Sequence, residues 1–301
     1  MENRKKWNQT RREKLLAWLF LSPATLAFVA FMFWPLAYTL YLSFLKWNMV
    51  APVKTMVGVK NYLDVLKDPV TVKLLVNTSL YIVILVFFNF VVPYLLAFAN
   101  TFVMQRGKNI YKTLLFIPSL VSLVVGAIVL QWIFNPISGP VGVILANFGI
   151  TMPSWSKTKG LVILVISLVA VFKSFGYNFL VLLSGMSSVS TELIEAARLE
   201  KTPNRKIFAK IVMPLTSSTA IYVFIMSIVQ GMQHVFTPTK VLTQGGPDNA
   251  SSNIIYGVYQ EAFGYYNTGK ASALSVITMI VFLILLFLEF KYVERGVYYE
   301  N

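Results

Sequence analysis

The sequence predicts an all-α integral membrane protein with six transmembrane helices. Hydrophobic residues make up 56% of its 301 residues and charged residues only 13%, whereas roughly a quarter of an ordinary soluble domain is charged. The mean hydropathy is +0.67. The apolar residues also fill uninterrupted stretches of about twenty, the length of helix that crosses roughly 30 Å of hydrocarbon. A soluble chain would instead spread them at helical or strand spacing.

Six apolar runs are long enough to span a bilayer. They are Leu15–Leu42, Tyr81–Val103, Leu114–Phe134, Leu161–Leu183, Ser217–Phe236 and Ala271–Phe290. The first run follows a basic stretch, but it is too long for the apolar region of a signal peptide and lacks a clear cleavage site, so we expect a retained signal anchor. The chain then divides into a basic N-terminal segment 1–14, a membrane domain 15–290 and a C-terminal segment 291–301.

The distribution of Lys and Arg predicts the orientation. If the N-terminus is cytoplasmic, sixteen of the 26 basic residues lie on the inner side and nine on the outer side, with Lys173 inside a span. This excess predicts that both termini face the cytoplasm. Because the basic residues flank the spans and do not gather on one domain, we expect membrane lipid, and no nucleic acid, as the partner of the net charge of +14.

The sequence offers little for catalysis. It has no cysteine, which excludes disulfides, thiolate metal sites and a cysteine nucleophile. Its one histidine, His234, has no second histidine with which to share a metal, and we expect a satisfied side chain at the membrane interface. Neither Gly107-Lys108 nor Gly269-Lys270 is followed by Ser or Thr, so neither forms a P-loop. We therefore expect no enzyme activity, metal or cofactor on this chain.

The polar segments between the runs have different characters on the two sides. Outside, residues 46–77 carry a turn and a short helix before Asp68-Pro69, and residues 135–160 are rich in Gly and Pro. We interpret both as caps on the outer mouth. Inside, the loop 187–214 is charged and long enough to reach a cytoplasmic partner.

Two short helices are predicted in the inner loop. Ser190 or Thr191 can cap the first, and Glu192 suits its positive end. Thr202 and Pro203 have the N-cap and N1 arrangement of a second helix, which runs to Pro214.

The first of these helices has a pattern suited to docking. Ala196 and Ala197 expose a narrow face, and Glu195 and Arg198 offer charges at the same end. Such a helix, held between two spans, could be moved as a rigid unit by a soluble motor. On these features alone, a solvated amphipathic loop without a partner remains the simpler interpretation.

The spacing of the loop resembles the EAA motif of binding-protein-dependent ABC importer permeases: Glu-Ala-Ala, three residues, Gly, nine residues, Ile, one residue, Leu-Pro. Here Glu195-Ala196-Ala197 is followed at that spacing by Lys201, Ile211 and Met213-Pro214. Lys201 replaces the Gly, so either the turn differs or this residue is strained.

Four other segments resemble the sugar-permease subunits of this family. They are Leu21–Ala24, Gly58–Pro69, Phe116–Pro118 and Leu242–Pro247. The last, with Gly245, Gly246 and Pro247, is typical of the maltose-type and glycerol-phosphate-type permease that comes first in a heterodimeric pair, and we expect these three residues in a periplasmic cap.

The resemblance implies a type I ABC importer permease in a bacterial cytoplasmic (inner) membrane. Its partners would be a second homologous permease, two ATPase subunits that carry ATP and Mg, and an extracytoplasmic solute-binding protein. The solute would be an oligosaccharide, a uronate or a glycerol phosphate. The coupling residues would be Glu195, Ala196, Ala197, Arg198, Lys201 and Pro203.

Polar residues within spans are expensive and tend to face an aqueous path or a bundle interior. The candidates for the substrate path are Lys173, Tyr177, Asn178, Asn89, Gln230 and Gln233. Tyr177 and Asn178 are expected about one turn from Lys173 on the same helix face. For Lys173 two roles stay open, a structural lysine, which we favour, and a contact to an anionic substrate.

The main alternative is a secondary transporter or channel that works without ATPase subunits. Such a protein would be expected to carry paired carboxylates or broken helices near the middle of the membrane. The acid nearest to a span is Glu289, at the very end of the last run. The sequence therefore favours the ABC permease.

Overall fold

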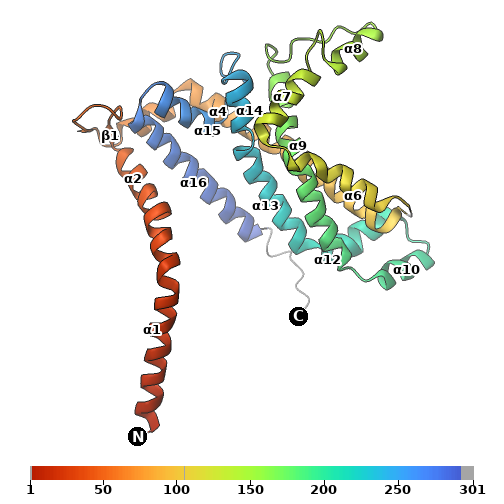
Figure 1. Ribbon diagram of the computed structural model, residues 1–301, viewed down its shortest axis with the longest axis horizontal. Coiled ribbons are helices and arrows are strands. Elements are labelled where there is room, and N and C mark those ends of the chain that lie inside the picture. The colour runs from red at the N-terminus through yellow and green to blue at the C-terminus, as the bar shows by residue number, and fades with distance from the viewer. Residues whose placement is uncertain (1, 105, 293–301) are drawn as a thin grey trace. The chain divides into compact units, whose positions relative to one another are not determined.

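The computed structural model describes residues 2–104 and 106–292, without the side chains of residues 2–12, 15, 288–290 and 292. Its N-terminal part contains α1 (Glu2–Phe28), α2 (Trp34–Leu42), β1 (Leu45–Lys46), β2 (Thr55–Met56), α3 (Lys60–Lys67), α4 (Pro69–Val86), α5 (Val92–Phe98), α6 (Lys108–Phe116), α7 (Leu123–Ile133) and α8 (Pro140–Asn147). Then follow α9 (Leu161–Ser187), α10 (Thr191–Leu199), α11 (Asn204–Ile207), α12 (Met213–Leu215), α13 (Ser217–Gln233), α14 (Phe236–Pro238), α15 (Ile254–Tyr259) and α16 (Thr268–Tyr292). Figure 1 shows this order along the chain.

Two compact units make up the chain. One contains residues 1–66 and 260–277, and the other contains residues 67–259 and 278–301. In the first unit, β1 and β2 form a short antiparallel hairpin that pairs Leu45 with Met56.

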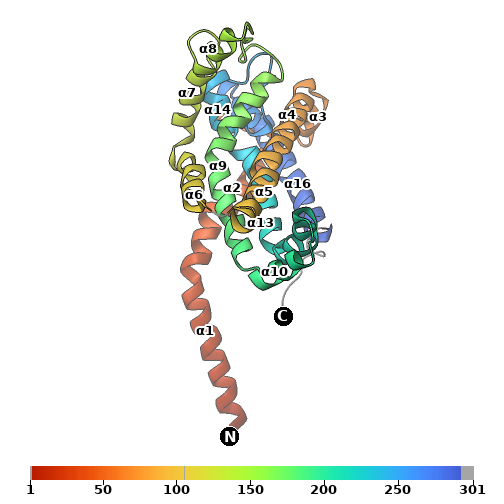
Figure 2. The same ribbon diagram turned by 90° about the vertical axis from the view of Figure 1, so that its right-hand side faces the viewer.

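The second unit is built on three long helices. α4, α9 and α13 pack against one another, as the two views in Figures 1 and 2 show. Tyr81, Ile166, Phe179 and Val223 are buried where these helices meet. The side chains of all three helices are largely apolar. The few polar side chains buried among them therefore need hydrogen-bond partners within the protein.

The spans agree with the sequence prediction at five of six places. By length and composition, helical segments at Leu16–Leu42, Pro69–Val103, Leu161–Ser187, Ser217–Thr243 and Thr268–Phe287 can each cross a membrane. The second begins twelve residues earlier than predicted, because Asp68 caps a helix at Pro69 and accepts a hydrogen bond from the Val70 N–H at 2.9 Å. The remaining span is different.

The third span is broken, which corrects the prediction of one helix over Leu114–Phe134. Lys108–Leu120 and Leu123–Ile133 meet at an angle of 105°. A 3-10 turn over Ile117–Leu120 contains Pro118, which lacks an N–H, and the chain then becomes extended at Val121. Ser122 starts the next helix as its N-cap, accepting from the Val125 N–H at 3.3 Å. The bent pair counts as the sixth span if both halves belong to one crossing.

Wide π turns precede three of the prolines. They cover Val29–Phe33, Phe87–Val91 and Phe208–Val212, and each ends two residues before a proline, at Pro35, Pro93 and Pro214. A proline removes one donor from the helical ladder, and a wider turn accommodates its ring without ending the helix. The helices therefore continue through these prolines.

Candidate coupling loop, buried polar cluster and outer cap

The first helix of the inner loop, α10, begins as predicted. Ser190 is its N-cap, and its hydroxyl accepts from the Glu192 N–H at 3.2 Å. The acidic Glu192 in the first turn and Arg198 in the last turn both suit the helix dipole.

The alanine pair of α10 does not share one face, which corrects the sequence interpretation. Ala197 is buried in the apolar core of its own unit, together with Ile194, whereas Ala196 and Glu195 are exposed. The exposed stripe consists of Glu192, Glu195, Ala196 and Leu199, and Leu199 is 85% exposed. A leucine exposed to this degree on a polar loop is a candidate contact for a partner.

Arg198 ties α10 to the inner end of the second span. Its guanidinium donates to the backbone oxygen of Phe102, in the π turn Ala99–Val103. A cavity of about 550 Å³ lies beside this contact and is lined by residues of both segments, including Thr101 and Glu195. Movement of α10 would therefore be transmitted to the second span through both the buried face and this hydrogen bond.

Lys201 lies in the left-handed region, with φ of +57°. The Lys201 N–H donates to Arg198 O at 2.9 Å and the Thr202 N–H to Ala197 O at 3.0 Å. These two bonds form a Schellman motif, which ends a helix with a left-handed residue, usually glycine. Lys201, at the glycine position of the EAA spacing, therefore takes the left-handed conformation that a glycine adopts readily, and it carries the strain that a glycine would avoid.

The second loop helix starts one residue later than predicted. Pro203 is the N-cap of α11, and its carbonyl oxygen accepts from the Lys206 N–H at 2.8 Å. Thr202 therefore belongs to the preceding turn and does not cap the helix. The Thr202 N–H is part of the Schellman motif that ends α10.

Three candidates for the substrate path form one buried cluster. Asn178 donates to Gln230 Oε1 at 3.0 Å and to the backbone oxygen of Asn89 at 2.9 Å, and all three side chains are buried. The carbonyl of Asn89 would normally bond to the N–H four residues later, but that residue is Pro93. Asn178 thus supplies the donor that Pro93 lacks, which gives this cluster a structural role.

Two other candidates are exposed on the surface of this unit. Tyr177 is 47% exposed and lies within hydrogen-bonding reach of Tyr222, itself 45% exposed, and Gln233 is also exposed. Tyr177 and buried Asn178 therefore face different ways, contrary to the prediction of one shared face, because consecutive residues of a helix differ by about 100°. Sequence reasoning missed Tyr222, because only the fold brings its hydroxyl beside Tyr177.

Lys173 holds the break in the third span. Its Nζ donates to the backbone oxygens of Ser119 at 2.6 Å and Val121 at 3.0 Å. These oxygens lie at the break, where regular helical partners are lost, and an ammonium suits the negative end of a helix. This geometry supports the structural role of the lysine over a contact to an anionic substrate.

His234 also has a partner within the fold. Its Nδ1 lies 2.7 Å from the Ser174 hydroxyl, one residue after Lys173. Among the described residues no cluster of three His, Cys, Asp or Glu side chains could hold a metal ion.

The segment Gly245–Pro247 opens a compact turn whose following residues are bound to α4. Gly245 has φ of +84°, and a Cβ there would lie 2.3 Å from Ser252 Oγ. The Asn77 amide donates to the backbone oxygens of Asn249 and Ser252, both at 2.9 Å, and the Tyr81 hydroxyl donates to Ser251 O. This turn and the residues that follow it therefore move with the start of the second span.

A small ion cluster lies at the surface of this turn. Asp248 Oδ2 lies 3.1 Å from Lys73 Nζ and 3.7 Å from Lys159 Nζ. The hydrogen bond from Lys73, with the charges of both lysines, holds the pKa of Asp248 below its ordinary value. Its favourable contribution is therefore present above the ordinary pKa of an aspartate, near 4, and is lost as the pH falls through the lowered pKa of the folded state.

Five helical segments of spanning length among the described residues, or six with the bent pair, joined by polar loops, define a multi-pass membrane protein. Residues 89–298 match the family of binding-protein-dependent transport system inner membrane components. The chain belongs to this family, and the resemblance seen in the sequence is confirmed.

Two curated relatives cover almost the whole chain. The sn-glycerol-3-phosphate transport system permease protein UgpA of Brucella abortus biovar 1 (strain 9-941) is 31% identical over 290 residues, 95% of this chain and 97% of the relative. The probable ABC transporter permease protein YurN of Bacillus subtilis (strain 168) is 29% identical over 288 residues, 95% of this chain and 98% of the relative.

The fold agrees with that of a solved ABC importer. A chain of the bacterial ABC transporter involved in the import of the acidic polysaccharide alginate superposes with a TM-score of 0.81 at 18% identity, covering 97% of this chain and 99% of that one. A chain of a bacterial alginate ABC transporter in complex with alginate pentasaccharide-bound periplasmic protein superposes with a TM-score of 0.80 at 18% identity, covering 94% of both chains. The predicted type I ABC importer permease fold is therefore confirmed, and the chain is an inner-membrane, multi-pass permease.

Proposed function

We propose that this chain is one of two homologous permease subunits of an ATP-driven importer. The importer takes a carbohydrate or a related solute, such as an oligosaccharide, a uronate or a glycerol phosphate, from a solute-binding protein. ATP and Mg would bind two separate ATPase subunits on the inner side, where both termini of this chain would also lie. Full-length relatives named for glycerol phosphate transport and a structural neighbour that imports an acidic polysaccharide support this class of solute.

The observation that carries the proposal is the geometry of α10. Its buried face and Arg198 fix it to the second span, while Glu195, Ala196 and Leu199 remain exposed. A short helix that packs against the spans on one face and is exposed on the other is suited to bind in a groove of an ATPase subunit. Movement of that subunit would then move the spans. Tyr177, Tyr222 and Gln233 are the exposed groups that best suit sugar hydroxyls and ring faces.

The test is steric and electrostatic disruption of the exposed stripe. Ala196→Trp and Glu195→Arg should abolish co-purification of the ATPase subunits, or the ATPase stimulation by loaded binding protein, while the permease remains folded in the membrane. Ala209→Trp adds the same bulk at another exposed alanine of the inner loop and is the matched control. Ala197→Trp is unsuitable, because that alanine is buried in the permease itself.

The proposal fails if Ala196→Trp and Glu195→Arg keep wild-type association and stimulation. Transport by wild-type protein in the absence of ATP and ATPase subunits would instead establish the secondary transporter.

A further inference from the structure

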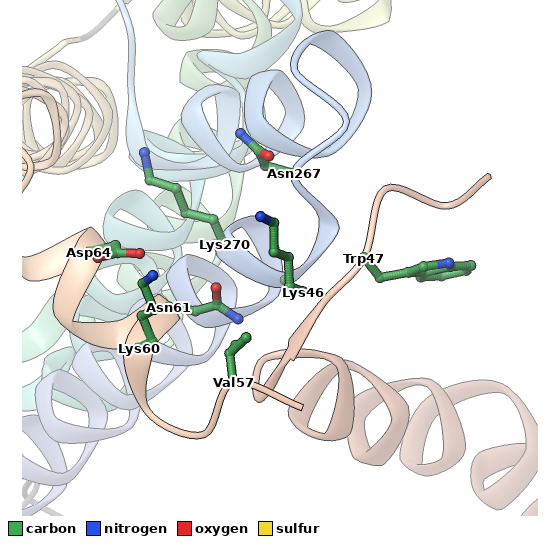
Figure 3. A pocket seen from close by; sticks show the side chains of 9 residues that line it. Lys46, Trp47, Val57, Lys60, Asn61, Asp64, Asn267 and Lys270 are labelled. Carbon is green, nitrogen blue, oxygen red and sulfur yellow. The ribbon is translucent and has the colours of Figure 1, made fainter. Parts of the chain in front are cut away.

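A polar cavity lies in the first compact unit, where the hairpin, α3 and the beginning of α16 meet. It has a volume of about 220 Å³ and is lined by Lys46, Lys60, Asn61, Asp64, Asn267 and Lys270, with Trp47 at its side. Figure 3 shows the lysines reaching this space from three separate segments. None of these residues belongs to the coupling loop or to the candidate substrate path.

The cavity has a rigid floor. Asn61 is 9% exposed and donates its amide hydrogens to the backbone oxygens of Ser43 at 2.8 Å and Leu45 at 2.9 Å. Gly269 packs so closely that a Cβ would lie 1.9 Å from Leu45 O, and the Thr268 N–H donates to Trp47 O at 3.1 Å. A site whose walls are held in this way needs little rearrangement to receive a ligand.

The charges that line the cavity are not balanced within it. Lys270 is paired, with its Nζ 2.7 Å from Glu261 Oε1. Lys46 and Lys60 make no ion pair within the described residues, and their acidic neighbour Asp64 also lacks one. Two unpaired cations against one unpaired acid leave the cavity with a positive charge.

The cavity also presents an acceptor. The Oδ1 of Asn61 receives no hydrogen bond within the described residues, although its amide nitrogen is fully used. A suitable occupant therefore offers both an anionic group, for Lys46 and Lys60, and an N–H donor, for Asn61. An acidic residue of a protein has both, because its side chain is a carboxylate and its backbone carries an N–H.

We propose that this cavity receives a carboxylate side chain of the solute-binding protein when it docks on the outer face. The volume is smaller than the roughly 300–1,000 Å³ of most small-molecule sites and fits a side chain better than an oligosaccharide. The segments expected on the outer side carry nine lysines against four acids, which favours an acidic partner. The inference rests on the proposed function and on the proposed orientation, in which both termini of the chain lie on the inner side of the membrane.

The test measures the affinity of the assembled transporter, reconstituted in lipid nanodiscs, for its loaded binding protein. Lys46→Glu and Lys60→Glu should each weaken binding about tenfold and flatten its salt dependence, with basal ATPase activity unchanged. The matched control is Lys67→Glu, at an exposed lysine of the same helix outside the cavity, which should change affinity by less than about twofold. An acidic residue of the binding protein whose change to Lys restores affinity to Lys46→Glu would identify the occupant.

Three results would overturn the inference. The affinity could be unchanged in both cavity variants, or it could fall equally in Lys67→Glu, which would show a general charge effect. Uptake could also fall while the affinity for the binding protein stays constant, which would make the cavity a subsite for the solute. In each case ATPase stimulation of the wild-type transporter by its binding protein would still support the proposed function, so the two failures are distinguishable.

Discussion

At the residue scale, Lys173 shows how an expensive group within a span becomes part of the architecture. An unpaired charge in the membrane would be unfavourable, but the ammonium here has two carbonyl oxygens at hydrogen-bond distance. Close packing supports the contact, because a Cβ at Gly176 would lie 2.3 Å from Leu115 O. The lysine therefore compensates for the hydrogen bonds that the broken span lacks.

Replacing Lys173 should weaken the fold more than it changes selectivity. Lys173→Met leaves the Ser119 and Val121 oxygens without this donor, and we expect a loss of about 2–4 kcal/mol, seen as a lower Tm of the assembled transporter. Lys173→Arg keeps a cation and should restore most of the stability. The opposite pattern, a normal Tm with selective loss of an anionic solute, would assign Lys173 to the substrate path.

At the scale of the element, the second span depends on a side chain from another helix. Its π turn Phe87–Val91 runs into Pro93, and the Asn89 carbonyl obtains its donor from Asn178 of α9. In hydrocarbon such a carbonyl cannot turn to water, so the helix that contains a proline needs a neighbour that satisfies it.

A double-mutant cycle can measure this dependence. Asn178→Leu should destabilise the permease by about 2–3 kcal/mol, because the Asn89 carbonyl and Gln230 Oε1 both lose a donor. Pro93→Ala restores a backbone N–H four residues after Asn89, so Asn178→Leu should cost about 1 kcal/mol less in that background. Ser227→Ala removes a 3.4 Å contact to Asn178 and the bond of the hydroxyl to Val223 O, but it leaves the Asn89 carbonyl with its donor, so it is the control and should have a small effect. Strict additivity in equilibrium unfolding would show that Asn178 does not act through the proline.

At the scale of the whole molecule, the exposed apolar surface and the charge distribution describe a protein in a membrane. In the first span Phe20, Phe31 and Trp34 are 79%, 84% and 69% exposed. Side chains of this size need lipid or another subunit around them. The inner excess of Lys and Arg then predicts which polar loops face the cytoplasm.

Single cysteines can test that orientation in this cysteine-free chain. Lys157 and Arg205 are exposed positions on loops predicted to lie outside and inside, respectively. A membrane-impermeant thiol reagent added to intact spheroplasts should label Lys157→Cys, and it should label Arg205→Cys only after permeabilisation. Labelling of both before permeabilisation would reject the arrangement with both termini inside.

The sequence by itself determined the membrane class, the five unbroken spans, the cap of α10 and the spacing of the coupling loop. These features depend on local properties, namely run length, capping residues and motif spacing, which the sequence displays directly. The family resemblance followed from the same spacing. The predicted roles of Glu195, Gly246 and Tyr177 stay predictions.

Only the tertiary structure decided where the polar side chains go. Among the predictions that failed, one helix over the third span depended on which distant neighbour satisfies which polar group. Lys173 lies more than fifty residues from the carbonyls it binds, and Asn178 lies 89 residues from Asn89. In a membrane, the hydrophobic pattern no longer distinguishes buried side chains from lipid-exposed ones. Long-range hydrogen bonds such as these then help to decide the shape of a span, and a sequence does not display them.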